Sequence, residues 1–265
     1  MTNPADPEHD DTLTIIAISI VALMLSTMLH EGIGHGAVAM LTGATSGTLT
    51  TVAWSSAYET KLIAAGGTIV NLIAGALFWL ALRADCRASP QTRLFLWIAS
   101  AFNLFTGTGY FLFSGISNFG DWAIVIAGLH PHWLWWVLLI AVGVAAYYAA
   151  MRIVGSGLVR YLGVPLTDSA RFRRLTWIPY FAAIAIDVVA GLRNPLGLAL
   201  VFESALPATA GANCALLFLT HYVPKSVAPG ANSQPVTGSY RWITASALLA
   251  LIFILVLGSG VQIGR

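Results

Sequence analysis

The feature that most constrains the fold of this chain is the length of its apolar segments. Long uncharged stretches recur along the sequence, for example at residues 62–82 and 133–151. A helix needs about 20 apolar residues to cross the hydrocarbon core of a bilayer. Only 9% of the 265 residues are charged, too few to cover a water-soluble domain of this size. These features predict an all-α polytopic membrane protein with about six to seven transmembrane helices.

Seven segments meet this length requirement. We expect the spans at residues 13–42, 61–82, 93–114, 133–153, 175–191, 196–219 and 241–260. They divide the chain into a polar N-terminal tail (1–12), a membrane core (13–130) and additional transmembrane helices (131–265). A stretch rich in Thr, Ser and Gly at residues 43–59 predicts a short β-hairpin or strand between the first two spans. The polar, Gly-rich segment 114–121 predicts an irregular loop that starts a short helix at Asp121.

The positive charges flank these spans unevenly. Ten Lys and Arg residues lie in segments on the same side as the N-terminus, and three (Lys61, Arg193 and Arg265) lie on the other, which accounts for all 13. Short cytoplasmic loops carry an excess of Lys and Arg. We therefore expect the N-terminus in the cytoplasm and the C-terminus outside, in a multi-pass protein of a bacterial inner membrane. The net charge is only +2 and no basic patch is interleaved with aromatic residues, so we expect lipid and no nucleic acid as a partner.

Polar residues inside the first span are the main functional signal. His30, Glu31 and His35 lie in its second half, where they should face protein or a water-filled cavity. Catalytic zinc sites typically use three protein ligands and leave one position open. His30, His35 and Asp121 could supply those ligands, and Glu31 is placed to act as the general base that takes a proton from the attacking water.

The spacing of the two histidines requires a distorted helix. Histidines that share a metal on one helix are usually four residues apart, whereas His30 and His35 are five apart. In a regular α-helix the extra residue would rotate His35 by about 100° from the shared face. A π-turn closes a ring between residues five apart and would restore the alignment. Gly32, Gly34 and Gly36 would ease such a distortion.

Three segments resemble the site-2 protease family of intramembrane zinc metalloproteases. His30-Glu31-Gly-Ile-Gly-His35 is similar to that family's H-E-x-G-H motif with one residue inserted. Ala65-Gly-Gly-Thr-Ile-Val-Asn71 resembles its glycine-and-asparagine helix beside the active site, and Asn103 followed by Asp121 resembles its N-x-x-P-x-x-x-L-D-G region without the proline and the final glycine. The resemblance covers residues 13–130.

The resemblance implies a zinc-dependent membrane endopeptidase that cleaves a peptide bond in or near a transmembrane segment. It implies Zn2+ held by His30, His35 and Asp121, and Glu31 as the base. Asn71 and Asn103 would support these groups or the substrate. The partner would be a transmembrane peptide or protein, and a separate membrane subunit would have to carry any regulation because the chain shows no soluble domain.

Other interpretations remain open from the sequence. The same metal could serve a hydrolase of lipids or small amphiphiles, or the chain could be a metal-binding scaffold or a transporter component. His30, Glu31 and His35 could form a polar packing cluster, and Asp121 could be only a helix cap. Further titratable residues with no assigned role are Asp187 and Glu203, either of which could replace Asp121 as third ligand, and His130, His132 and His221.

Overall fold

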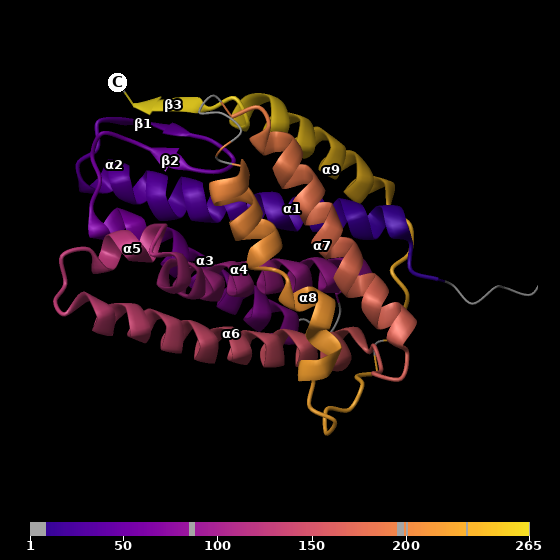
Figure 1. The fold of residues 1–265 in the computed structure, drawn as a ribbon. Coiled ribbons are helices and arrows are strands. Elements are labelled where there is room, and N and C mark those ends of the chain that lie inside the picture. The colour runs from indigo at the N-terminus through magenta and orange to yellow at the C-terminus, as the bar shows by residue number, and fades with distance from the viewer. Residues whose placement is uncertain (1–8, 85–87, 195–198, 200, 232, 265) are drawn as a thin grey trace, which may run out of the picture.

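Long helices dominate the computed structural model, which describes residues 9–84, 88–194, 199, 201–231 and 233–264, without the side chains of residues 203 and 204. Within these residues six helices are long and apolar enough to cross a membrane (Figure 1). The first is continuous from α1 (Thr12–Met28) through η1 (Leu29–Ala37) to α2 (Val38–Thr42), followed by α3 (Lys61–Ala84), α4 (Pro90–Ser117), α6 (His132–Leu162), α7 (Ser169–Gly191) and α9 (Tyr240–Ile252) with η5 (Phe253–Leu257). The predicted all-α polytopic membrane fold is confirmed.

The predicted span at residues 196–219 is not a regular helix. Its described part consists of η2 (Val201–Ala205), η3 (Pro207–Gly211), α8 (Ala215–Phe218) and η4 (Leu219–Tyr222). The prediction of a continuous helix here was wrong, because Pro207 has no N–H to donate and two π-helical turns interrupt the α-helical hydrogen bonding. Residues 195–198 and 200 lie outside the described part of the chain.

This broken segment nevertheless runs from one end of the bundle to the other. Val201 packs against Gly191 at the end of α7, whereas Val223, just after η4, packs against Gly155 near the end of α6. The segment therefore returns antiparallel to α7 (Figure 1).

Contacts near the helix ends show which segments lie together at each end of the bundle. Asp10 forms an ion pair with Arg171, in the first turn of α7, and Asp11 N–H donates to Val236 O, before α9. At the opposite end, β3 (Val261–Gly264) pairs with β1 (Ser46–Leu49), which follows the first span. The C-terminal strand thus lies at the end of the bundle opposite residue 9 (Figure 1).

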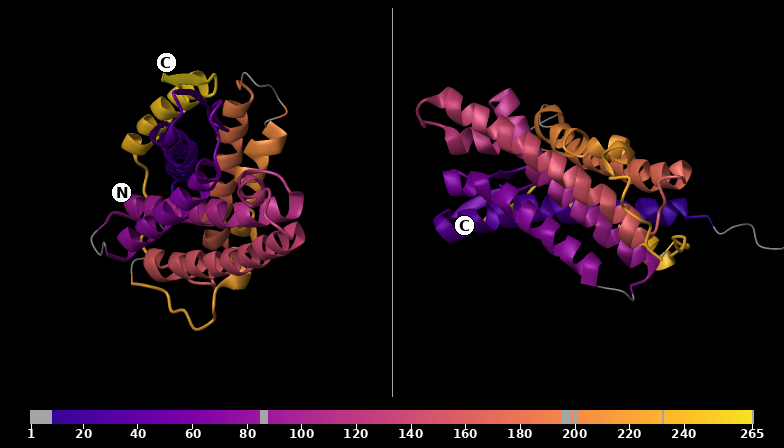
Figure 2. Two further views of the ribbon diagram at one scale, coloured as in Figure 1. Left: turned by 90° about the vertical axis from the view of Figure 1, so that its left-hand side faces the viewer. Right: turned by 90° about the horizontal axis from the view of Figure 1, so that it is seen from below.

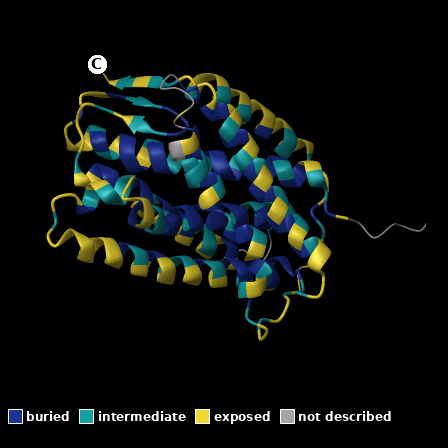
Figure 3. Cartoon of the chain, in the orientation of Figure 1, coloured by how far each residue is buried: buried dark blue, intermediate teal, exposed yellow. Residues whose placement is uncertain are grey.

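The α1 helix lies at the centre of the core. It packs against α4, α7 and α9, and α4 packs against α3 and α6. Ile15 and Ile18 of α1 and Trp97, Phe102 and Phe105 of α4 are fully buried. Helices α6 and α9 lie on opposite sides of the bundle (Figure 2) and expose most of their apolar residues (Figure 3). Such surfaces fit a lipid environment.

A small sheet covers one end of the first span. The strand β2 (Trp54–Ser55) pairs antiparallel with β1, and β1 also pairs antiparallel with β3, in the order β2-β1-β3. The predicted hairpin between the first two spans is confirmed. The third strand was not predicted, because it has only four residues and its partner is more than 200 positions away in the sequence.

Candidate metal centre

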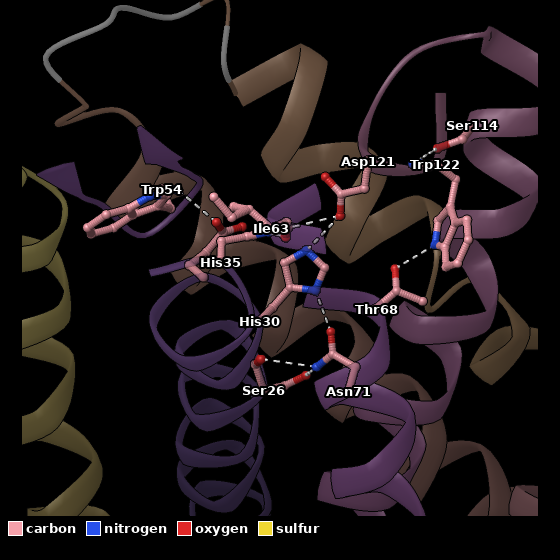
Figure 4. Close-up of polar contacts among 11 residues, drawn as sticks. Ser26, His30, His35, Trp54, Ile63, Thr68, Asn71, Ser114, Asp121 and Trp122 are labelled. Atoms are coloured by element: carbon pink, nitrogen blue, oxygen red, sulfur yellow. Dashed lines mark hydrogen bonds and ion pairs between the residues drawn. The ribbon is translucent and has the colours of Figure 1, made fainter. Parts of the chain in front are cut away.

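A π-helix carries the two histidines of the first span. The segment from Leu29 to Ala37 is π-helical, as the five-residue spacing predicted. Nε2 of His30 lies 3.3 Å from Oδ2 of Asp121, and Nε2 of His35 lies 3.4 Å from the same oxygen (Figure 4). The distortion therefore turns both imidazoles toward one carboxylate, and it brings together the three residues that the sequence identified as candidate ligands.

Close contact between η1 and α3 holds this π-helix. A Cβ atom on Gly34 would lie 2.4 Å from Cα of Gly67, and one on Gly66 would lie 1.9 Å from the carbonyl oxygen of Gly34. Only glycine on both helices permits this approach of the two backbones. Gly34 therefore permits close packing of η1 against α3, a role beyond the backbone distortion expected from the sequence.

Asp121 is placed by a tight turn after α4. Asn118 and Gly120 have positive φ angles of 52° and 83°, which end α4 and start the short helix α5 (Asp121–Ile126). The indole Nε1–H of Trp122 donates to Oγ1 of Thr68 on α3 at 3.0 Å (Figure 4). The interpretation of Asp121 as a helix cap is not supported, because Gly120 is the cap residue and Oδ2 of Asp121 faces the histidines.

A chain of amides orients His30. Nδ2 of Asn103 donates to the carbonyl oxygen of Ala99 at 2.8 Å, so its Oδ1 accepts from Nδ2 of Asn71 at 2.7 Å. The amide oxygen of Asn71 then lies 2.5 Å from Nδ1 of His30. Since that oxygen can only accept, Nδ1 of His30 carries the proton and Nε2 of the neutral ring presents its lone pair to Asp121. The predicted supporting roles of Asn71 and Asn103 agree with this arrangement.

His35 is oriented in the same way by a backbone group. Its Nδ1 lies 2.7 Å from the carbonyl oxygen of Ile63 on α3, which can only accept a hydrogen bond. The neutral ring therefore also directs an unprotonated Nε2 toward Asp121. Two histidines with their outer nitrogens held by hydrogen-bond acceptors and their inner nitrogens free are the usual arrangement of metal ligands.

The space among these three side chains fits a divalent metal ion. Ligands at about 2.0–2.1 Å from a tetrahedral ion lie about 3.3–3.4 Å apart. Nε2 of His30 and Oδ2 of Asp121 are buried and have no hydrogen-bond partner among the described residues. A Cβ atom on Gly67 would lie 2.6 Å from Nε2 of each histidine, so the missing side chain leaves this space open. The donor set could therefore bind a metal.

Glu31 borders a cavity of about 560 Å³ together with His35 and Asp121. Its side chain is 6% exposed, and Oε2 accepts a hydrogen bond of 2.8 Å from the backbone N–H of Trp54, at the start of β2 (Figure 4). The predicted hairpin thus borders the site and holds one oxygen of Glu31. The carboxylate is positioned beside the candidate ligands without being one of them.

The remaining candidates lie elsewhere. Asp187 is buried in α7 and accepts a hydrogen bond from Thr209, and His132 contacts Asn118 in the loop after α4. His130 and His221 are exposed. None of these four joins a group of potential metal ligands in the described chain, and the side chain of Glu203 lies outside the described residues.

Two residues of the site had no assigned role from the sequence. The ring of Tyr110 on α4 stacks on His30 with ring centres 4.6 Å apart, and Gly67 leaves space for the candidate ligands. Gly67 lies in the glycine-rich segment already noted, so its presence was visible although its role was not. Tyr110 gave no signal, because an aromatic residue in a membrane helix usually only packs.

Comparison with family models, with curated proteins and with solved structures finds no match to this chain.

Proposed function

We propose that this protein is an intramembrane zinc metallopeptidase that cleaves a peptide bond in or near a transmembrane segment. The observation that carries the proposal is the convergence of His30, His35 and Asp121 at one point, with Glu31 lining the same cavity as His35 and Asp121. Two histidines and one carboxylate suit zinc among the common divalent ions.

The proposed chemistry assigns a distinct task to each group. A bound zinc ion would supply a Lewis acid that makes water more acidic and polarises the scissile carbonyl. Glu31 accepts a proton from the attacking water as the carbon–oxygen bond forms, and passes it to the amine as the carbon–nitrogen bond breaks. The N–H of Trp54 holds one oxygen of Glu31, which orients the carboxylate for both transfers.

The walls of the cavity support a peptide from the membrane as substrate. Phe113, Phe119 and Ile124 form apolar walls, and Ser55, Ser56 and Glu59 line it beside β2. A transmembrane helix must unwind before cleavage because its carbonyls are hydrogen-bonded within the helix. β2 lies at the edge of its sheet, where it could pair with such an extended segment.

The charge distribution supports the proposed orientation in a bacterial inner membrane. Arg160, Arg171, Arg173 and Arg174 lie at the end of the bundle that also holds residue 9, whereas Lys61 and Arg193 lie at the other. The positive-inside rule assigns the first end to the cytoplasm. The candidate metal centre, which η1 and α5 form, then lies in the half of the membrane nearer the outside.

The same site could hydrolyse a lipid or another small amphiphile. The observation that favours this alternative is the apolar wall of the cavity, which extends from Asp121 to Ala212 and Cys214 beyond η3. An acyl chain would fit such a wall as well as an apolar side chain does. Parallel assays with a transmembrane peptide and with a phospholipid, both in mixed micelles, distinguish the two substrates.

Metal content and cleavage measured on the same preparations test the proposal. Detergent-purified wild type should contain about one zinc ion per chain, because the described residues hold one group of three potential ligands. His35→Ala and Asp121→Ala should lose the ion, whereas Glu31→Gln should keep it and lose cleavage. A wild type without zinc would contradict the metal centre. Zinc retained with no hydrolysis of either substrate would favour a scaffold or transporter component.

A further inference from the structure

A second, smaller cavity borders Glu31. Its volume is about 30 Å³, and its lining includes Glu31, Thr51, Asp187 and Thr209. We call it the inner chamber. It is distinct from the large cavity, which Asp187 and Thr51 do not line. The inner chamber therefore joins Glu31 to a carboxylate on α7 that the proposed mechanism does not use.

Asp187 lies near the C-terminal end of α7 with one neutral hydrogen-bond partner. It is 3% exposed, and one of its oxygens accepts a hydrogen bond from the hydroxyl of Thr209 on η3. No Lys or Arg forms an ion pair with it among the described residues. A carboxylate inside a membrane span is expensive without hydrogen-bond donors. Because Asp187 lines the inner chamber, a hydrogen-bond donor in that chamber would stabilise its carboxylate.

The hydroxyl group of Thr51 also needs a hydrogen-bond partner. Its Oγ1 is buried and has no hydrogen-bond partner among the described residues. A buried polar atom without a protein partner usually bonds to ordered water. The inner chamber of about 30 Å³ exceeds the roughly 10–15 Å³ of cavity volume that a water molecule needs, and a buried water needs about two to four polar partners.

We propose that one trapped water bridges Asp187 to Glu31, and that Asp187 is a positioning residue for Glu31. The water donates one hydrogen to each carboxylate and accepts the hydrogen of the Thr51 hydroxyl, which satisfies all three groups. Oε2 of Glu31 is held by Trp54 N–H, so a bond from the water on the other oxygen would fix the rotation of the carboxylate. The role of Asp187 in turnover rests on the proposed function, whereas the water bridge does not.

Kinetics of variants at Asp187 test the positioning role. Asp187→Leu should lower kcat roughly tenfold, as for other groups that orient a catalytic residue, with KM and zinc content unchanged. Asp187→Asn should restore most of kcat, because its amide oxygen accepts from the same water. The matched control is Thr176→Val, which removes a buried hydroxyl of α7 that bonds within its own helix. Unchanged kcat in Asp187→Leu, or loss of zinc, would overturn the proposal.

Infrared difference spectroscopy tests the bridge without any turnover. The carboxyl band of Asp187 is identified by its disappearance in Asp187→Asn. The bridge predicts that this band shifts in Glu31→Gln and in Thr51→Val, and that it stays in place in Thr176→Val. If the frequency of the Asp187 band is the same in Glu31→Gln as in the wild type, the water bridge is wrong. If the band shifts but the protein cleaves no substrate, the peptidase proposal is wrong and the water bridge between Asp187 and Glu31 is still supported.

Discussion

The amide oxygen of Asn71 lies 2.5 Å from Nδ1 of His30, and the amide nitrogen of Asn71 lies 3.2 Å from the backbone oxygen of Ser26. That second contact fixes which way the amide faces, because a carbonyl oxygen can only accept. One side chain of α3 therefore sets the tautomer of a candidate ligand on η1. A buried Asn that only packs between membrane helices would not need its amide oxygen to face a histidine.

Removal of this amide should weaken metal binding. We expect Asn71→Leu to lower zinc affinity about 10- to 100-fold, because His30 would lose the acceptor that orients its ring. Competition with a chromophoric chelator measures the affinity. The matched control is Ser100→Ala, which removes a buried hydrogen bond from Ser100 on α4 to Gly75 on α3, away from the metal centre. Equal losses in both variants would show a general loss of packing.

A methyl group at Gly67 should close the metal centre. The Cβ of Gly67→Ala would lie 2.6 Å from Nε2 of both histidines, so we expect loss of zinc. Gly75→Ala on the same helix is the control, because its Cβ would meet only Leu104. That variant should lose stability in a thermal unfolding assay and keep its zinc. Full zinc content in Gly67→Ala would contradict the ligand geometry.

Removal of the C-terminal strand should loosen the hairpin beside Glu31. Truncation after Gly260 removes the partner of β1, and β1 in turn holds β2 with Trp54. We expect faster amide hydrogen exchange across residues 46–55, measured by mass spectrometry, because exchange follows local opening. Gln262→Ala, which removes one side-chain hydrogen bond to Thr48, should leave the exchange nearly unchanged. Unaltered exchange after truncation would show that the hairpin is held by the helices alone.

The N-terminal cap of α1 should make stability depend on acidity. Asp11 accepts the N–H of Thr14, and hydrogen bonds from Thr14 lower the pKa of Asp11 below its ordinary value. A carboxyl group with a lowered pKa in the folded state stabilises that state above its ordinary pKa, and this contribution disappears as the pH falls through the lowered value. Thermal unfolding of wild type should therefore lose more stability below about pH 4 than that of Asp11→Asn, which keeps a cap without the charge. Parallel pH profiles for the two proteins would contradict this role.

Much of this architecture follows from local pattern. Apolar segments of about 20 residues form helices in a bilayer, because a helix satisfies the hydrogen bonds of its own backbone N–H and C=O groups. The same local logic located the hairpin and the short helix at Asp121, and the five-residue spacing of His30 and His35 required the π-helix that the structure contains. These features depend on neighbours within a few residues, so the sequence determined them.

Contacts between distant segments needed the tertiary structure. The pairing of β3 with β1 and the stacking of Tyr110 on His30 join residues whose sequence patterns do not refer to one another. The direction of the Asn71 amide, the space left by Gly67 and the inner chamber between Glu31 and Asp187 likewise arise only when α3, α7 and η1 pack together. The sequence determined the two candidate histidine ligands and most of the helices long enough to cross a membrane. Packing between helices decided which carboxylate meets the histidines, because that depends on distances that no local pattern encodes.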